Sequence, residues 1–173
     1  MVTAGIDVQD DRLEVEVLGI GRDEETWSLD YKVLYGDPSA PQLWNDLDAL
    51  MATTYERKDG FELAIQAGAV DTGGHHTQAV YKYCKPRYGR RIFAIKGVGG
   101  EAKPLVGRPS TNNNMKCKLF SIGVDTAKEI VYSRLRIQEE GAGYCHFPID
   151  RDDEYFRMLT AEEIVTRFHK GFR

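Results

Sequence analysis

Two aspartates, each ending an apolar run, are the residues of this chain whose type and spacing suggest chemistry. Asp7 closes the run at residues 2–6, and Asp71 closes the run at residues 64–70, just before Thr72-Gly73-Gly74. Such runs of small and β-branched residues, bounded by turn residues, predict strands. Two carboxylates at neighbouring strand ends repel each other unless a cation compensates their charge. Because Mg²⁺ and Mn²⁺ prefer oxygen ligands, the pair predicts a divalent-metal site.

The chemistry that such a site performs is phosphodiester hydrolysis. Two metal ions about 4 Å apart activate a water molecule and stabilise the leaving oxygen. The spacing of Asp7 and Asp71 leaves a second interpretation open, in which each aspartate only caps a strand or forms a turn. The first interpretation requires a fold that brings the two strand ends together.

The elements before Asp71 predict such a fold. Residues 2–9, 13–18 and 26–35 alternate apolar and polar side chains or are rich in aromatic and β-branched residues, and short turns join them, so we expect an antiparallel meander. A helix from Pro41 to about Tyr55, capped by Ser39, follows. The next strand, at residues 63–70, leads into Asp71.

The elements after Asp71 extend the same pattern. We expect a helix at 77–85 that Pro86 and Gly89 end, a strand at 91–97, a long polar loop at 97–114 and a strand at 118–124. A helix capped by Asp125, a short strand at 144–148 and a helix at 155–169 complete the chain. The order β-β-β-α-β-α-β predicts an α/β, ribonuclease H-like domain whose mixed sheet combines an antiparallel meander with parallel strands and is flanked by helices. In that order the first strand and the strand after the first helix are neighbours.

Composition limits the class of protein. The chain has 173 residues, of which 42% are hydrophobic and 29% charged, as in a soluble domain with one core. It contains no run of about 18 apolar residues, so we expect no membrane span. Its three cysteines, Cys84, Cys117 and Cys145, are too widely spaced for a zinc motif or a disulfide framework, and we expect reduced, buried thiols.

The charge is unevenly distributed. The formal net charge is −4, yet between residues 82 and 118 only Glu101 opposes a set of ten cations. A local basic face of this kind can contact phosphates, and a solvated charged surface is the alternative. The ten cations are Lys82, Lys85, Arg87, Arg90, Arg91, Lys96, Lys103, Arg108, Lys116 and Lys118.

Four short motifs resemble the C-terminal nuclease domain of the large terminase subunit of lambda-like tailed phages. They are Gly5-Ile6-Asp7-Val8-Gln9, Val70-Asp71-Thr72-Gly73-Gly74, Ala94-Ile95-Lys96-Gly97 and Gly123-Val124-Asp125-Thr126-Ala127-Lys128-Glu129. The resemblance covers nearly the whole chain, and it includes His146-Phe147-Pro148 and Leu159-Thr160-Ala161-Glu162-Glu163.

The resemblance implies a single ribonuclease H-like nuclease domain at residues 1–173, cut from a longer chain with an upstream packaging ATPase. It implies a Mg²⁺- or Mn²⁺-dependent endodeoxyribonuclease with two ions, which cuts concatemeric viral DNA in the host cytoplasm. The implied partners are double-stranded viral DNA and, through the full-length protein, the small terminase subunit and the portal. No GxxxxGK[ST] motif is present, so we expect no P-loop ATPase activity from this chain.

Site residues are carried over from the family one by one. Asp7 matches the metal ligand of the first strand and Asp71 the second ligand. The family's third acid lies on a helix after the region that matches residues 159–168, so we expect it beyond Arg173 and expect the isolated fragment to be weakly active or inactive. Asp125 is the third catalytic candidate within the chain because it stands in a family motif, although a helix N-cap explains it equally well. Asp150 and Asp152 are further candidates, and a solvated acidic turn is their alternative.

Six further residues are candidate DNA or phosphate contacts. His75, and His76 beside it, follow the Asp71 strand directly, and an exposed histidine pair at a helix start is the alternative. Lys96 ends a strand on the side of the acids if that strand runs parallel to residues 63–70. Arg108, Lys116 and Lys118 are candidates by their position in and after the long loop.

Two competing functions remain. One is a catalytically incomplete ribonuclease H-like module that docks on a partner of the packaging motor, such as the portal, or binds DNA. The other is an actin-like phosphotransferase, because Gly5-Ile6-Asp7 and Asp71-Thr72-Gly73-Gly74 also suit that class. The residues after Asp7 do not wrap a phosphate closely, however, and the chain is too short for the two lobes of such an enzyme.

Overall fold

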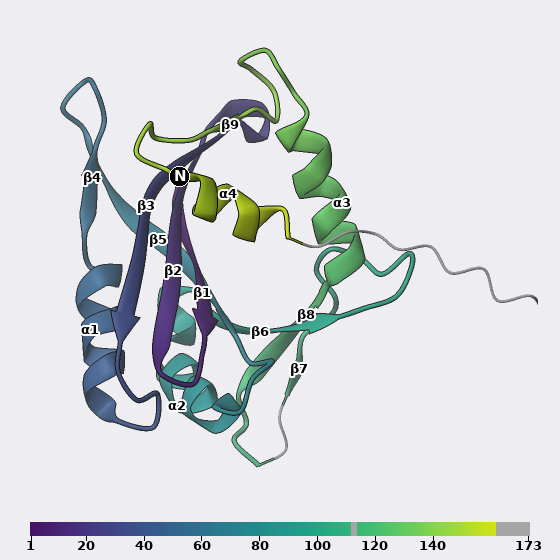
Figure 1. Cartoon of the computed structure of the whole chain (residues 1–173). Helices are drawn as coiled ribbons and strands as arrows, with labels where there is room; N and C mark the ends of the chain where they lie inside the picture. Colours follow the sequence, from purple (N-terminus) through teal and green to yellow (C-terminus); the bar gives the residue numbers. More distant parts are fainter. Residues whose placement is uncertain (112–113, 162–173) are drawn as a thin grey trace, which may run out of the picture.

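The computed structural model describes residues 1–111 and 114–161, which form a mixed sheet with helices on both faces (Figure 1). Strands β1 (Val2–Val8), β2 (Arg12–Ile20) and β3 (Thr26–Tyr35) form the predicted antiparallel meander. A short 3-10 helix, η1 (Arg22–Glu24), lies in the turn between β2 and β3.

The parallel half of the sheet begins at β1. Strand β5 (Glu62–Asp71) pairs in parallel with β1, β6 (Ile92–Val98) with β5, and β8 (Lys118–Gly123) with β6. Three short strands extend the edges: β4 (Thr54–Glu56) on β5, β7 (Ser110–Thr111) on β8 and β9 (Cys145–His146) on β3. This arrangement confirms the predicted ribonuclease H-like mixed sheet, with β1 and β5 as neighbours.

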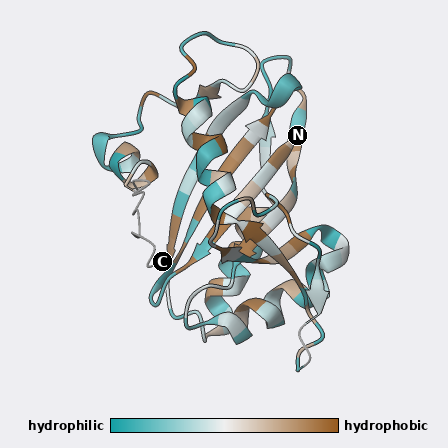
Figure 2. Ribbon diagram, turned by 90° about the vertical axis from the view of Figure 1, so that its right-hand side faces the viewer, coloured by the Kyte–Doolittle hydropathy of each residue, from teal (hydrophilic) through white to brown (hydrophobic). Residues whose placement is uncertain are grey.

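The hydrophobic core lies between one face of the sheet and helices α1 (Pro41–Met51) and α2 (Thr77–Arg87). Leu13, Val15 and Val17 alternate along β2 and are fully buried, as the period of two in their strand predicts. On α1, Leu43, Leu47 and Met51 recur every four residues, which places them on one side of the helix. Figure 2 shows the hydrophobic residues gathered along the strands and the sides of the helices that face them.

The opposite face of the sheet is polar and only partly covered. It carries helices α3 (Val124–Leu135) and α4 (Asp153–Leu159), and α4 lies beside the meander strands in Figure 1. The ring of Tyr155 on α4 contacts the ring of Tyr31 on β3, with 5.7 Å between centroids. Neither helix contains a buried residue. Among the described residues, no helix combines the length and apolarity needed to cross a membrane.

Several predicted helix boundaries are wrong. The first helix ends at Met51 and not near Tyr55, because residues 54–56 pair with β5 as β4. Pro86 lies inside the last turn of α2, and the 3-10 helix η2 (Tyr88–Arg90) follows. Ser39 does not cap α1: its N–H and hydroxyl both donate to Asp37. Asp125 does not cap α3, whose N-cap is Gly123.

The long loop at 97–114 is more regular than the sequence predicts. Residues 110–111 form β7, and Val106 makes a β-bridge to Ile122. The Gly107 N–H donates to the Ser121 carbonyl at 2.8 Å, so the described part of the loop packs back against β8. Towards the C-terminus, the predicted strand at 144–148 shortens to β9, and the predicted helix at 155–169 begins as α4 at Asp153. The part of that helix after residue 161 lies outside the described residues.

Leu47 allows a direct test of the core. Its side chain is fully buried between α1 and the sheet, so Leu47→Ala removes buried methyl groups and leaves a cavity. We expect a loss of about 2–5 kcal/mol in the free energy of unfolding, measured by urea denaturation. Ile149→Ala, at a fully exposed position, is the matched control and should change stability by less than about 0.5 kcal/mol. Equal effects of the two substitutions would contradict this description of the core.

Candidate active site

The parallel pairing of β1 with β5 brings Asp7 and Asp71 side by side. Ile6 pairs with Val70, and the two aspartates are the next residues on each strand. Neighbouring strands lie about 5 Å apart, which sets the separation of the two Cα atoms. Because Ile6, Val8 and Val70 are buried against α1 and α2, the alternation along each strand directs both aspartates to the opposite, polar face. The structure therefore places both acids on one face and at one edge of the sheet.

Neutral donors hold the two carboxylates. The side-chain amide of Gln9 donates to Asp7 at 2.5 Å, and the N–H of Gly73 donates to Asp71 at 3.1 Å. Within residues 1–111 and 114–161, neither aspartate forms an ion pair. Two adjacent carboxylates without a compensating cation are a donor set that suits Mg²⁺ or Mn²⁺.

A third acid on the same face, Glu14, is fully engaged. It pairs across the sheet with Asp7, and its two oxygens accept from the guanidinium of Arg12 at 2.8 Å and the hydroxyl of Tyr31 at 2.9 Å. Burial and the bond to Glu14 raise the pKa of Tyr31 to about 12, so this hydroxyl stays protonated and continues to donate. Glu14 is therefore a structural acid whose charge is compensated.

A fourth acid, Glu16, joins the sheet to the segment before α4. Ser28 donates to Glu16 at 2.5 Å, and Arg151 donates to the same serine hydroxyl at 3.1 Å. The guanidinium of Arg151 also lies 5.1 Å from the ring centroid of Tyr155. Burial raises the pKa of Glu16, while Ser28 and Arg151 oppose that shift. The network fastens residues 151–155 onto the polar face.

Asp125 is not grouped with the two strand-end acids. It lies in the first turn of α3, and its carboxylate accepts from the N–H of Gly100 at 2.8 Å. Asp152 caps α4 by accepting from the Tyr155 N–H, and Asp150 lies 3.9 Å from Arg151. Across the part of the chain that the structure describes, no three His, Cys, Asp or Glu side chains are grouped to hold a metal ion. The described residues thus bring together the pair Asp7 and Asp71, without a third acid grouped to share a metal ion with them.

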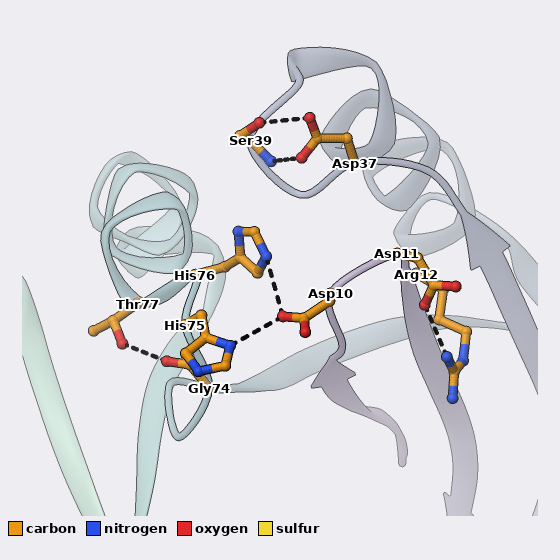
Figure 3. Close-up of polar contacts among 9 residues, drawn as sticks. All are labelled: Asp10, Asp11, Arg12, Asp37, Ser39, Gly74, His75, His76 and Thr77. Atoms are coloured by element: carbon orange, nitrogen blue, oxygen red, sulfur yellow. Dashed lines mark hydrogen bonds and ion pairs between the residues drawn. The ribbon is translucent and has the colours of Figure 1, made fainter.

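His75 and His76 converge on a different carboxylate, that of Asp10 (Figure 3). The ring nitrogens lie 3.2 Å (His75) and 3.6 Å (His76) from the same Asp10 oxygen. A Cβ on Gly74 would lie 3.3 Å from the Val8 carbonyl, so the loops after β1 and β5 approach each other closely. The histidines therefore join the two loops that follow the acid-bearing strands.

The candidate basic contacts take different positions. Strand β6 is parallel to β5, which was the condition for Lys96 to lie on the side of the acids. Ile95 is the residue of β6 that pairs with Asp71, however, and Lys96 is the residue after it. Its side chain is therefore directed to the face opposite the acids. Arg108 is exposed in the loop that packs on β8. Lys116 and Lys118 are exposed at the start of β8.

Sequence reasoning missed the network around Glu14 and Glu16. The alternation of these residues with Leu13, Val15 and Val17 predicts a half-buried strand but does not identify their partners. Arg151, which compensates Glu16, is far away in the chain and lies in a stretch that resembles a solvated acidic turn. All three cysteines are free thiols, with Cys84 and Cys117 buried and Cys145 partly exposed.

Comparisons with known proteins relate the chain to one family of phage proteins. Residues 1–173 match the family described as terminase large subunit gpA, endonuclease domain. The chain is 36% identical to the terminase large subunit of Escherichia phage lambda and 33% identical to that of Enterobacteria phage P21, each over 98% of this chain and 28% of the relative. The chain therefore spans little more than a quarter of the length of these relatives. Among solved structures, Thermus thermophilus RuvC matches at 19% identity with a TM-score of 0.35, over 56% of this chain and 62% of that one.

The raised pKa of Glu16 predicts a pH-dependent stability. Because the folded pKa lies above its ordinary value of 4.5, the protonated form favours folding, and this contribution is lost as pH rises through the folded pKa. Glu16→Gln keeps an acceptor for Ser28 and stays neutral. We therefore expect its melting temperature to rise relative to the unmodified chain between pH 4 and pH 7. Glu62→Gln, at an exposed position of β5, should follow the unmodified chain, and a parallel pH profile for Glu16→Gln would rule out the burial effect.

Proposed function

The chain belongs to the family of terminase large subunit gpA endonuclease domains, and from this premise we propose that it is a metal-dependent DNA endonuclease whose metal ligands include Asp7 and Asp71. The observation that carries the proposal is the pair of adjacent carboxylates that lack a cationic partner among the described residues. When bound, Mg²⁺ or Mn²⁺, in two ions, supplies the positive charge that activates water and stabilises the leaving oxygen of a phosphodiester.

The residues of this chain have distinct roles in that proposal. Asp7 and Asp71 provide the ligand oxygens, and the rigid pairing of their strands fixes the spacing of those oxygens. Gln9 and the Gly73 N–H orient one carboxylate each by bonding to an oxygen of it. A third ligand would come from outside the described residues, since no third acid is grouped with Asp7 and Asp71 within residues 1–111 and 114–161.

The proposed substrate is double-stranded viral DNA. The relatives are named as large terminase subunits, and the family resemblance implies the cutting of concatemeric phage DNA in the host cytoplasm during packaging. Contacts with the small terminase subunit and the portal belong, in this proposal, to the longer protein, of which this chain corresponds to 28%. The basic stretch between residues 82 and 118 supplies positive charge for a nucleic-acid backbone.

One observation favours a second candidate function. The described residues group two acids and not three, as expected for a ribonuclease H-like module that binds DNA or a motor partner without cleaving. The two candidates differ in one measurable property, which is Mn²⁺-dependent cleavage of DNA by this chain and by a chain extended beyond Arg173.

Asp7→Asn tests the nuclease directly. It removes a ligand charge without changing the size of the side chain, so we expect Mn²⁺-dependent nicking of supercoiled plasmid to fall by roughly 100-fold or more. At 100 times its Kd, Mn²⁺ should stabilise the unmodified chain by about 2.7 kcal/mol and so raise its melting temperature. The melting temperature of Asp7→Asn should stay nearly unchanged when Mn²⁺ is added.

The control for this experiment is Asp23→Asn. Asp23 is exposed and has a positive φ of 51°, a conformation that asparagine also adopts readily. The control should keep both the nicking activity and the response to Mn²⁺. Nicking that survives in Asp7→Asn would remove this residue from the site. Nicking by neither the chain nor its C-terminally extended form would leave the non-cleaving module as the function.

A further inference from the structure

A hollow of about 250 Å³ lies at the start of strands β6 and β8, away from the edge that carries the acids. Its floor is apolar and buried, and it includes Cys84, Cys117 and Ile92. Its rim is formed by Tyr88 and by three exposed lysines, Lys85, Lys116 and Lys118. We call the hollow with this rim the lysine pocket. Among the residues that the structure describes, no carboxylate lines the hollow.

The three lysines of the lysine pocket lack acidic partners. None of them forms an ion pair within residues 1–111 and 114–161. The ammonium of Lys118 lies 4.5 Å from the ring centroid of Tyr88 and donates to its hydroxyl at 3.3 Å, so the tyrosine holds this charge in place without neutralising it. Three uncompensated positive charges around one concavity attract an anion more strongly than lysines dispersed on a flat surface.

The rim of the lysine pocket reaches the face that carries Asp7 and Asp71 through Lys118, whereas its floor lies on the α2 side of the sheet. Ile95 pairs with Asp71 on one side and with Phe120 on the other, so Phe120 shares the face of the acids. Lys118 lies two residues before Phe120 and shares that face. The rings of Tyr88, Phe93 and Phe120 form a continuous row of edge-to-face contacts, at 5.6 and 5.3 Å, beside it.

The spacing from the acids matches a nucleic-acid backbone. Lys118 is two strands away from Asp71 and two residues back along the strand direction, which corresponds to roughly 12 Å between Cα atoms. The value of about 3.4 Å per nucleotide is the rise along the duplex axis, and the winding of the strand makes successive phosphates lie farther apart than this. A strand whose scissile phosphate lies at Asp7 and Asp71 therefore presents a phosphate within about three nucleotides of it to the lysine pocket.

We propose that the lysine pocket binds a backbone phosphate of the DNA within about three nucleotides of the scissile bond, and thereby positions the strand across the two acids. This inference rests on the proposed endonuclease function for its choice of DNA as the ligand. It adds Lys85 and Tyr88 to Lys116 and Lys118, and it assigns the four residues one shared role. The contact is to phosphate and so carries no sequence preference of its own.

The test measures DNA affinity as a function of salt. The protein is the 173-residue chain carrying Asp7→Asn, so that cleavage does not consume the ligand, and the probe is a fluorescent 30-base-pair duplex. We expect Lys118→Gln to weaken binding roughly three- to tenfold and to reduce the slope of log K against log salt by about 0.9, as for one lost phosphate contact. Lys116→Gln combined with Lys118→Gln should reduce the slope further.

Two control variants separate a phosphate contact from other effects. Lys58→Gln removes the same charge at an exposed position between β4 and β5 and should leave the slope unchanged. Lys118→Arg keeps the charge and should retain the slope of the parent, whereas a purely structural role for Lys118 would not be rescued by charge alone. A change in slope for Lys118→Gln no larger than that for Lys58→Gln overturns the proposal, as does a chain that does not bind the duplex.

A separate nicking assay on the chain with Asp7 intact distinguishes failure of this inference from failure of the proposed function. If the chain nicks DNA with Mn²⁺ and Lys118→Gln leaves the salt slope unchanged, the lysine pocket does not bind phosphate, and the proposed nuclease function is retained. A reduced slope without nicking, in this chain and in its extended form, supports the lysine pocket as a DNA-binding surface and removes the nuclease.

Discussion

The parallel pairing of β1 with β5 is the constraint on which the rest of the structure depends. It joins residues 2–6 to residues 65–70 and so places Asp7 beside Asp71, although most of the meander and all of α1 separate them in the chain. Small residues on β5 make the pairing compatible with the helix above it. A Cβ on Gly68 would come within 2.9 Å of Met51 on α1 and 3.2 Å of Ile92 on β6. A glycine at this position lets α1 pack closely over the strand that carries the second acid.

The two faces of the sheet have different physical roles. The face under α1 and α2 buries the aliphatic side chains whose removal from water stabilises the fold. The other face carries the acids, the network around Glu16 and the aromatic row beside Lys118. In the proposed function, the groups that would contact metal lie on this half-covered face, while the core on the opposite face keeps their strands rigid. The division follows from the period of two in each strand, because every buried residue on β1 has an exposed or partly exposed neighbour.

Much of this fold was predictable from the sequence because its strong signals are local. Alternation along β2 and the four-residue spacing on α1 depend only on nearby residues, and so does the run that ends in each acid. The errors come from partners distant in the chain. Tyr55 continues the apolar pattern of α1, but residues 54–56 instead pair with β5. Asp125 has the position and type of a helix cap, but its carboxylate accepts a hydrogen bond from the N–H of Gly100. Arg151 lies near Glu16 and Ser28 in the folded sheet, although it is more than 100 residues away from them in the chain.

The charges on the polar face distinguish structural acids from candidate ligands. Four carboxylates, those of Asp7, Asp71, Glu14 and Glu16, project from three neighbouring strands. The two glutamates have cationic neighbours, Arg12 for Glu14 and Arg151 for Glu16, whereas the two aspartates are held by an amide and a backbone N–H, which orient them without cancelling their charge. Leaving two carboxylates on neighbouring strands uncompensated costs on the order of 1 kcal/mol when they face solvent at a separation of about 5 Å. A lysine or arginine in that place would remove this cost, but it would also compete with a divalent cation for the same oxygens. Among the described residues, Asp7 and Asp71 lack such a partner on a face where Glu14 and Glu16 have one. The proposed metal site requires this pattern, whereas a purely structural sheet edge does not.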